Sequence, residues 1–123
     1  MPTVRTDPYL STTALAISYF CTDYDFTGCD KVGAAWDTAG NRYDLSNVSI
    51  KFSETAKKLT YTGQITPPSD ITLDRVRFEA EKTIDTTLYV IAPVEVGDIG
   101  QSLSANVTYQ IVLEVTLQVP SSF

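Results

Sequence analysis

The sequence contains no histidine among its 123 residues. Histidine is the commonest general base and metal ligand near neutral pH, so its absence excludes a Ser–His–Asp or Cys–His site within one chain. No stretch reaches the roughly 18 apolar residues that cross a bilayer as a helix. These two absences argue against an enzyme and against a membrane-spanning protein.

Positive charge is scarce as well, since 15 aspartates and glutamates outnumber 9 lysines and arginines and give a net charge of −6. An acidic surface repels phosphate backbones and anionic lipid headgroups, so we expect no nucleic-acid partner and no membrane partner. The first twenty residues place an arginine, an aspartate and proline before a short apolar run, which makes a poor signal peptide. We therefore expect a chain that is made in a cytosol and stays there, is assembled there, or is released by lysis.

Cysteine occurs only at Cys21 and Cys29, eight positions apart around a glycine-containing turn. The pair is either a disulfide across a hairpin loop or two reduced thiols, and the sequence leaves both open. Asp23 and Asp25 begin this loop in the manner of a calcium site, but its twelfth position, where an EF-hand needs an acid, is Ala34. The sequence therefore predicts no metal and no other cofactor.

What the chain has in quantity is alternation of apolar and polar residues, the period of a half-buried β-strand. The longest case is 103–119, in which every odd-numbered residue is apolar. Shorter runs precede it at steady spacing, separated by polar turns. We predict an all-β protein, an antiparallel β-sandwich of jelly-roll or Ig-like type with seven to eight strands and little or no helix. Residues 13–123 form this single domain, and residues 1–12 form an extended N-terminal arm, either loose or packed on a neighbouring subunit.

Within residues 71–81 the apolar side chains change from odd to even positions at Asp74–Arg75. One extra residue in a strand has this effect, so we predict a β-bulge there. The charged residues around and after it then line a solvated face or a salt-bridging interface: Arg75, Arg77, Glu79 and Glu81.

Two other positions predict local geometry. The Gly40-Asn41 pair is typical of a hairpin tip, which would make Trp36 and Tyr43 a facing cross-strand pair. Gly63 lies inside an apolar strand and predicts either a bulge or the close approach of another backbone.

The alternating run 103–119 is too long for the body of one domain. At ~3.3 Å per residue it would span about 56 Å, whereas a compact chain of this length is about 35 Å across. The strand must bend near Val112, where both faces are apolar, or one end must leave the domain and add to a neighbour's sheet. The segment 86–93 is also apolar on both faces. We therefore predict a subunit interface at five residues: Tyr89, Ile91, Val112, Val119 and Phe123.

Two patterns occur together in residues 71–117, a strand I-T-x-x-x-V-R-F and a closing strand V-T-Y-x-I-x-L, joined by a turn and an apolar segment. The matching residues are Ile71, Thr72, Val76, Arg77, Phe78, Val94, Gly97, Gly100, Leu103, Val107, Thr108, Tyr109, Ile111 and Leu113. In this combination the region resembles β-sandwich domains in virion proteins of tailed phages and archaeal viruses. The Gly/Asn-rich turn of that pattern is replaced here by Glu81-Lys82-Thr83. The resemblance implies a capsid, decoration, tail or fibre subunit with no chemistry of its own.

We therefore expect a structural subunit of the virion that self-associates as a homo-oligomer, or binds other structural proteins, through β-strand or terminal-arm contacts. One alternative is an extracellular filament or pilus subunit built by donor-strand exchange. A second is a carbohydrate-binding or adhesion module that binds surface glycans through exposed aromatic residues: Tyr9, Tyr19, Tyr24, Trp36, Tyr43 and Tyr61. We expect no catalytic residues and no enzymatic activity.

Overall fold

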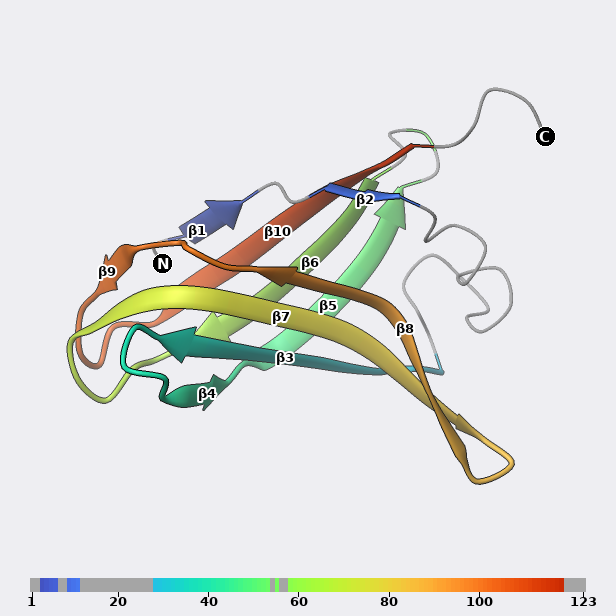
Figure 1. Ribbon diagram of the computed structural model, residues 1–123, viewed down its shortest axis with the longest axis horizontal. Coiled ribbons are helices and arrows are strands. Elements are labelled where there is room, and N and C mark those ends of the chain that lie inside the picture. The colour runs from blue at the N-terminus through green and yellow to red at the C-terminus, as the bar shows by residue number, and fades with distance from the viewer. Residues whose placement is uncertain (1–2, 7–8, 12–27, 54, 56–57, 119–123) are drawn as a thin grey trace.

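The computed structural model describes residues 3–6, 9–11, 28–53, 55 and 58–118 as two packed layers of β-sheet (Figure 1). The first layer, which we name the β10 sheet, contains β1 (Thr3–Thr6), β2 (Tyr9–Ser11), β5 (Ser46–Ser53), β6 (Lys58–Ile65) and β10 (Tyr109–Gln118). The second layer, the β7 sheet, contains β3 (Asp30–Asp37), β4 (Arg42–Asp44), β7 (Ile71–Ile84), β8 (Thr87–Val96) and β9 (Gln101–Leu103). None of the described residues is helical.

The strand order is β1-β10-β6-β5 in the β10 sheet and β4-β3-β7-β8 in the β7 sheet, with β2 also paired to β10 and β9 to β7. Every pairing among the eight strands β3 to β10 is antiparallel. The prediction of an all-β antiparallel sandwich without helix is confirmed in the part of the chain that the structure describes.

The N-terminal arm contributes β1 and β2, and both run parallel to this chain's own β10. β6 occupies the other edge of β10. Both edges of the last long strand are therefore covered within one chain. The described parts of the arm therefore pair with their own domain, which corrects the expectation of a loose arm or of one packed on a neighbouring subunit. The predicted projection of the far end of this strand falls on residues 119–123, outside the described residues.

The core lies between the layers, because the strands turn alternate side chains inward. In β6, for example, every second residue from Leu59 to Ile65 is buried. The largest fully buried side chains come from both sheets: Tyr61, Phe78, Ile50, Leu59, Leu73, Ile91, Leu103, Ile111, Leu113 and Val76. At Gly63 a Cβ atom would lie 3.0 Å from Leu45 and 3.1 Å from Phe78. The predicted close approach is present there, although side chains rather than another backbone make it.

The predicted bulge at Asp74–Arg75 is confirmed by the pairing of β7 with β3. Trp36 pairs with Arg75, while the next residue, Asp37, pairs with Leu73, so Asp74 is the extra residue. Leu73 and Val76 are both fully buried although they lie an odd number of positions apart. The bulge therefore explains why the apolar pattern changes register without any side chain leaving the core.

The predicted Trp36–Tyr43 pair is wrong. The hairpin tip forms where expected, with Gly40 at φ 87°, but Tyr43 pairs with Ala35 and Trp36 pairs with Arg42. Neighbouring residues of a strand point to opposite faces, so the two rings lie on opposite faces of the β7 sheet. Trp36 instead lies beside two guanidinium groups, with Arg75 4.2 Å and Arg42 5.6 Å from its ring centroid.

The predicted single strand 103–119 is also wrong, since it is two strands in different sheets. β9 ends at Leu103 in the β7 sheet, residues 104–108 cross between the layers, and β10 starts at Tyr109. The crossing is fixed by hydrogen bonds from the Ala105 N–H to Asp70 (2.8 Å) and from the Asn106 N–H to the Pro67 carbonyl (2.7 Å). The chain thus bends before Tyr109 rather than near Val112.

Candidate functional site

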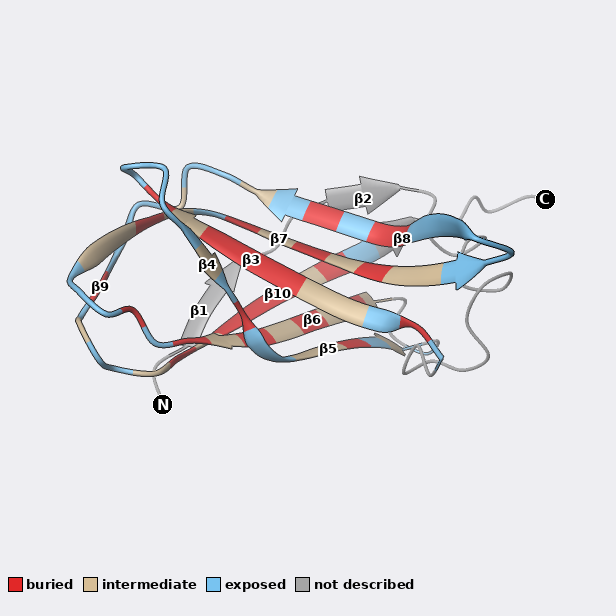
Figure 2. Cartoon of the chain, turned by 90° about the horizontal axis from the view of Figure 1, so that it is seen from below, coloured by how far each residue is buried: buried red, intermediate tan, exposed pale blue. Residues whose placement is uncertain are grey.

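Among the described elements, the β7–β8 hairpin projects beyond the end of the other strands of the β7 sheet (Figure 1). β3 accompanies β7 only as far as Glu81, which pairs with Asp30. Beyond that point Lys82, Thr83 and Ile84 pair only with β8 among the described strands. The tip of the hairpin is therefore a two-stranded ribbon, and its two faces are coloured as largely exposed in Figure 2.

The tip closes through a two-residue turn, Asp85-Thr86, because Ile84 pairs with Thr87. Both turn residues have positive φ, 49° and 67°. Positive φ at both positions is the geometry of a type I′ turn, which suits the twist of a hairpin but favours Asn and Gly. The sequence supplies neither residue, which is why the turn could not be predicted from it.

Four large apolar residues at the tip are exposed: Ile84 (38%), Leu88 (56%), Tyr89 (38%) and Val90 (46%). Ile91 belongs to the core, so Tyr89 continues the core-side face while Leu88 and Val90 lie on the outer face. An isolated exposed apolar residue is normal, but four within seven residues make the tip a candidate interaction surface.

The structure separates the five residues predicted as a subunit interface. Tyr89 is exposed at the tip, whereas Ile91 (1%) and Val112 (6%) are buried within the chain itself. Ile91 packs in the core because it pairs with Ala80, where β7 still lies over the β10 sheet. Ile91 and Val112 therefore offer no surface to a partner. Val119 and Phe123 lie outside the described residues.

Sequence reasoning missed Leu88 and Val90, which share the predicted two-faced apolar segment with Tyr89. The sequence does contain a signal for them, because Leu88 and Val90 are apolar at the alternate positions that are polar in a strand with one solvated face. Pattern alone could not decide whether that second face meets this chain or a partner.

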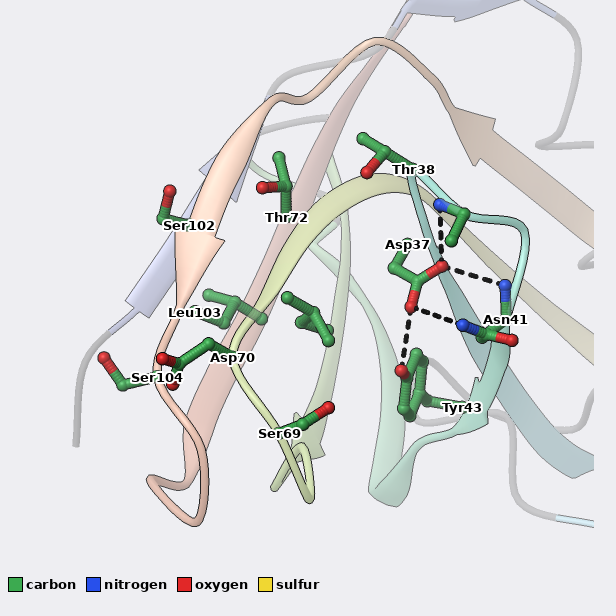
Figure 3. A pocket seen from close by; sticks show the side chains of 12 residues that line it. Asp37, Thr38, Asn41, Tyr43, Ser69, Asp70, Thr72, Ser102, Leu103 and Ser104 are labelled. Atoms are coloured by element: carbon green, nitrogen blue, oxygen red, sulfur yellow. Dashed lines mark hydrogen bonds between the residues drawn. The ribbon is translucent and has the colours of Figure 1, made fainter.

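A polar cleft of about 620 Å³ lies at the other end of the sandwich, beside the β3–β4 hairpin (Figure 3). Its lining residues are Asp37, Thr38, Ala39, Asn41, Tyr43, Ser69, Asp70, Ile71, Thr72, Ser102, Leu103 and Ser104. The lining contains two carboxylates and neither lysine nor arginine. The cleft therefore disfavours anions and offers acceptors to neutral or cationic groups.

Asp37 is the buried carboxylate of this cleft, 5% exposed, and it organises the hairpin. One carboxylate oxygen accepts the backbone N–H groups of Ala39 (3.0 Å) and Asn41 (2.9 Å). The other accepts the Asn41 amide (3.1 Å) and the Tyr43 hydroxyl (2.8 Å). Burial alone would raise the pKa of Asp37, but these four hydrogen bonds outweigh it and lower that pKa. The same contact raises the pKa of Tyr43.

Because all four hydrogen bonds run within residues 37–43, the Asp37 carboxylate serves to hold the hairpin together. Asp70 similarly accepts the Ala105 N–H of the loop that links the two sheets. The cleft thus gathers the polar anchors of two loops. Its carboxylates are hydrogen-bonded to the chain itself, which is the ordinary state of structural side chains.

The aromatic residues named for glycan binding do not gather on one face. Tyr61 is fully buried, Tyr43 borders the cleft, and Trp36 lies on the opposite face of its sheet. Tyr19 and Tyr24 lie outside the described residues, as does the side chain of Tyr9.

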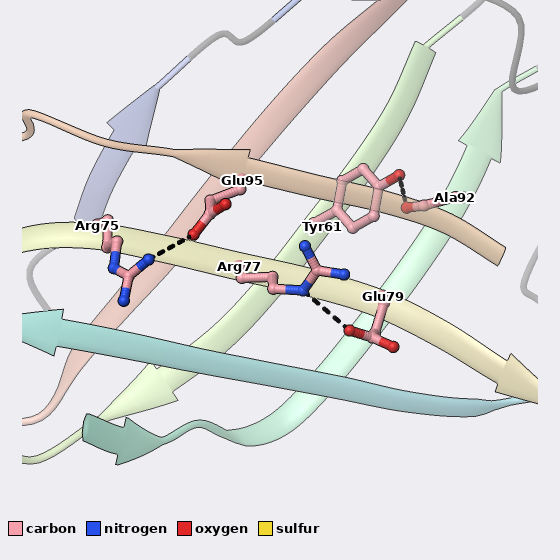
Figure 4. Close-up of polar contacts among 6 residues, drawn as sticks. All are labelled: Tyr61, Arg75, Arg77, Glu79, Ala92 and Glu95. Carbon is pink, nitrogen blue, oxygen red and sulfur yellow. Dashed lines mark hydrogen bonds and ion pairs between the residues drawn. The ribbon is translucent and has the colours of Figure 1, made fainter. Parts of the chain in front are cut away.

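The predicted charged face of β7 carries two ion pairs (Figure 4). Arg75 contacts Glu95 of β8 at 3.1 Å, and Arg77 contacts Glu79 at 3.0 Å. The Arg75–Glu95 pair is exposed and the Arg77–Glu79 pair is partly buried. Exposed pairs are typically worth less than about 1 kcal/mol. This face thus resembles a solvated surface with internal charge pairing.

Cys29 is buried, 8% exposed, and Cys21 lies outside the described residues, so the disulfide stays a prediction. Among the residues described, no three histidine, cysteine or acidic side chains cluster as a metal site requires. Nor do these residues form any helix with the length and apolar character needed to cross a membrane.

No family model, no curated protein and no solved structure matches this chain. The function must therefore be argued from the geometry of the tip and of the cleft.

Proposed function

We propose that this protein is a structural subunit of a protein assembly, in the first place a virion component such as a capsid, decoration, tail or fibre protein. The observation that carries the proposal is the exposed apolar tip of the β7–β8 hairpin, formed by Ile84, Leu88, Tyr89 and Val90. These residues lie at and beyond the last pair that β3 makes with β7, in the part of the hairpin that Figure 2 colours as exposed.

Burial of apolar surface is the main favourable term in protein association, at about 25 cal/mol per Å². A hairpin that presents apolar side chains on both faces gains from contact with a partner on either face. The resemblance of residues 71–117 to virion sandwich domains also favours a structural role. The whole β7–β8 hairpin lies within that region.

Donor-strand exchange receives less support, because the described strands of the N-terminal arm pair with β10 of their own chain rather than with a neighbour's sheet. A glycan-binding module also receives less support, since its aromatic residues are buried or divided between faces.

The proposal is tested by light scattering after size exclusion over a series of concentrations, together with negative-stain microscopy. We expect a mass above the 13.5 kDa of one chain and regular particles, rings or fibres. A chain that stays monomeric at every concentration, and that is absent from purified particles probed by mass spectrometry, would refute the proposed role.

A further inference from the structure

We propose that the first half of β8 pairs edge to edge with β8 of a second copy of this chain, antiparallel and about a two-fold axis at Tyr89. This inference rests on the proposed function and names the contact through which the subunits associate. β8 is an edge strand, since among the described residues its only partner strand is β7.

The turn geometry decides which backbone groups of β8 point outward. In a two-residue hairpin the pair that closes the turn, here Ile84 and Thr87, is hydrogen-bonded, and hydrogen-bonded pairs alternate with non-bonded pairs along the ladder. Leu88 pairs with Thr83 and Val90 with Glu81 in the non-bonded positions. The N–H and C=O groups of Leu88 and Val90 therefore point away from β7.

These outward groups are self-complementary. When two copies of β8 meet antiparallel with Tyr89 on the axis, Leu88 of one lies opposite Val90 of the other, and each such pair exchanges two hydrogen bonds. The two-fold axis repeats the pair, so all the outward groups of Leu88 and Val90 are used. An isologous contact of this kind is the commonest arrangement in homo-oligomers.

The side chains agree with this register. Leu88 (56% exposed) and Val90 (46%) lie on the same face and become direct cross-strand neighbours between the copies. Both would lose exposure to water, which is the apolar burial that the isolated chain lacks. The two β7 sheets would then continue into each other as one sheet.

Electrostatic complementarity also favours a second copy. The edge segment 87–92 contains no charged residue, so two copies of an acidic chain with net charge −6 can approach there. In each copy, the residue of β7 that pairs with Tyr89 is Lys82. The nearest charges of like sign level with the axis are therefore the two Lys82 side chains, one on each β7 strand. Three strand spacings separate them by about 14 Å, more than the ~8 Å Debye length at physiological salt.

Two other edge strands, β4 and β5, carry devices that prevent strand addition. β4 has only three residues and exposes Arg42 and Asp44. β5 carries an irregularity at 46–49, with Asn47 at φ 50°, and exposes Lys51. The second half of β8 is protected in the same way, by a bulge at Ala92 (φ 52°), by Pro93 and by Glu95. Residues 87–91 have none of these features.

The test compares two identical substitutions at exposed valines. Val90→Lys places a charge at the proposed contact, whereas Val107→Lys does the same in the β9–β10 loop at the opposite end of the molecule, where Val107 is 36% exposed (Figure 1). We expect Val90→Lys to abolish the two-chain unit and so lower the mass from scattering, and Val107→Lys to leave that mass unchanged. Circular dichroism and thermal melting verify that both variants fold.

The register is tested by oxidation of single-cysteine additions in the otherwise native chain. Tyr89→Cys brings two thiols face to face on the axis, within the Cα separation that a disulfide needs, and we expect a covalent dimer. Leu88→Cys lies two positions out of register with its own mate and beyond that separation, so we expect little cross-linking.

The outcomes separate the two proposals. An assembly that survives Val90→Lys unchanged, or that cross-links equally well through Leu88→Cys, would overturn the β8 contact and leave the structural role standing. A wild-type chain that remains monomeric would overturn both. Loss of assembly in Val90→Lys alone, with cross-linking confined to Tyr89→Cys, supports both.

Discussion

The hydroxyl of Tyr61 in β6 donates a 2.7 Å hydrogen bond to the carbonyl of Ala92 in β8 and so links the two sheets through the core (Figure 4). Ala92 is the extra residue of the β8 bulge, because Phe78 pairs with Val94 whereas Ala80 pairs with Ile91. A bulge turns a carbonyl out of the ladder, and Tyr61, fully buried, satisfies it. Burial also raises the pKa of Tyr61 far above its ordinary value, so this hydroxyl remains a donor.

Tyr61→Phe is expected to destabilise the protein by about 1–3 kcal/mol, because the Ala92 carbonyl would remain buried without a partner. Chemical denaturation measures the change in the free energy of unfolding. Tyr109→Phe is the control, since the Tyr109 hydroxyl accepts the Ser104 N–H in a partly buried position that water can reach. An equal loss in both variants would contradict the structural role given to the Tyr61 bond.

Gly63→Ala is expected to cost about 1–3 kcal/mol, because its Cβ would press on Leu45 and Phe78 at 3.0 and 3.1 Å in a close-packed core. Gly97→Ala is the matched control, since nothing lies within 4 Å of a Cβ there. That control is expected to be neutral or to gain about 0.4–1 kcal/mol from a less flexible unfolded chain. Equal melting temperatures for the two variants would show that the β6 backbone has room to move.

Thr86→Gly is expected to stabilise the chain by about 0.5–1 kcal/mol, because a β-branched residue at φ 67° is strained and glycine is not. Thr87→Gly, one residue later and inside β8, should destabilise by about 0.5–1 kcal/mol. The two melting curves should therefore shift in opposite directions. A shift in the same direction would mean that the tip does not adopt the turn described here.

The Asp37 network predicts a dependence of stability on pH. The pKa of the folded-state carboxyl lies below its ordinary value of 3.8, so its contribution is complete above that value and is lost as the pH falls through the folded pKa. Asp37→Asn has a single carboxamide oxygen and cannot accept all four hydrogen bonds. We expect this variant to melt at a lower temperature near neutral pH.

The gap between wild type and Asp37→Asn should close as the pH falls from about 6 to 2, which thermal melting by circular dichroism would follow. A gap that stays constant over that range would mean that the carboxylate charge contributes nothing at this position.

Much of the fold could be predicted because two-residue periodicity is a strong signal wherever one face is buried. The bulge at Asp74 could be predicted for the same reason, because it changes the apolar positions from odd-numbered to even-numbered residues. The crossing at 104–108 could not be predicted, because Ala105 and Val107 continue the apolar alternation of a strand. The backbone nevertheless leaves the strand conformation there, with Asn106 at a positive φ of 62°. Its cause is tertiary, namely hydrogen bonds to Asp70 and to the Pro67 carbonyl.

The candidate site was predictable only in part. The segment 86–93 is apolar on both faces, and this pattern predicts an interface that includes Tyr89. Which of its residues are exposed depends on where β3 stops accompanying β7, at the Asp30–Glu81 pair. The extent of the β3–β7 pairing depends on two strands far apart in the sequence, so no local sequence pattern predicts where it ends.

The irregular second half of β8 has a consequence for particle architecture. Ala92 and Pro93 stop strand addition after a few residues, and the opposite border of the same sheet ends in the short, charged β4. Growth through this contact therefore halts at two chains instead of continuing into an open fibril. A shell or tube made from this protein would be built from two-chain units. Contacts at another surface of that unit would set the larger lattice.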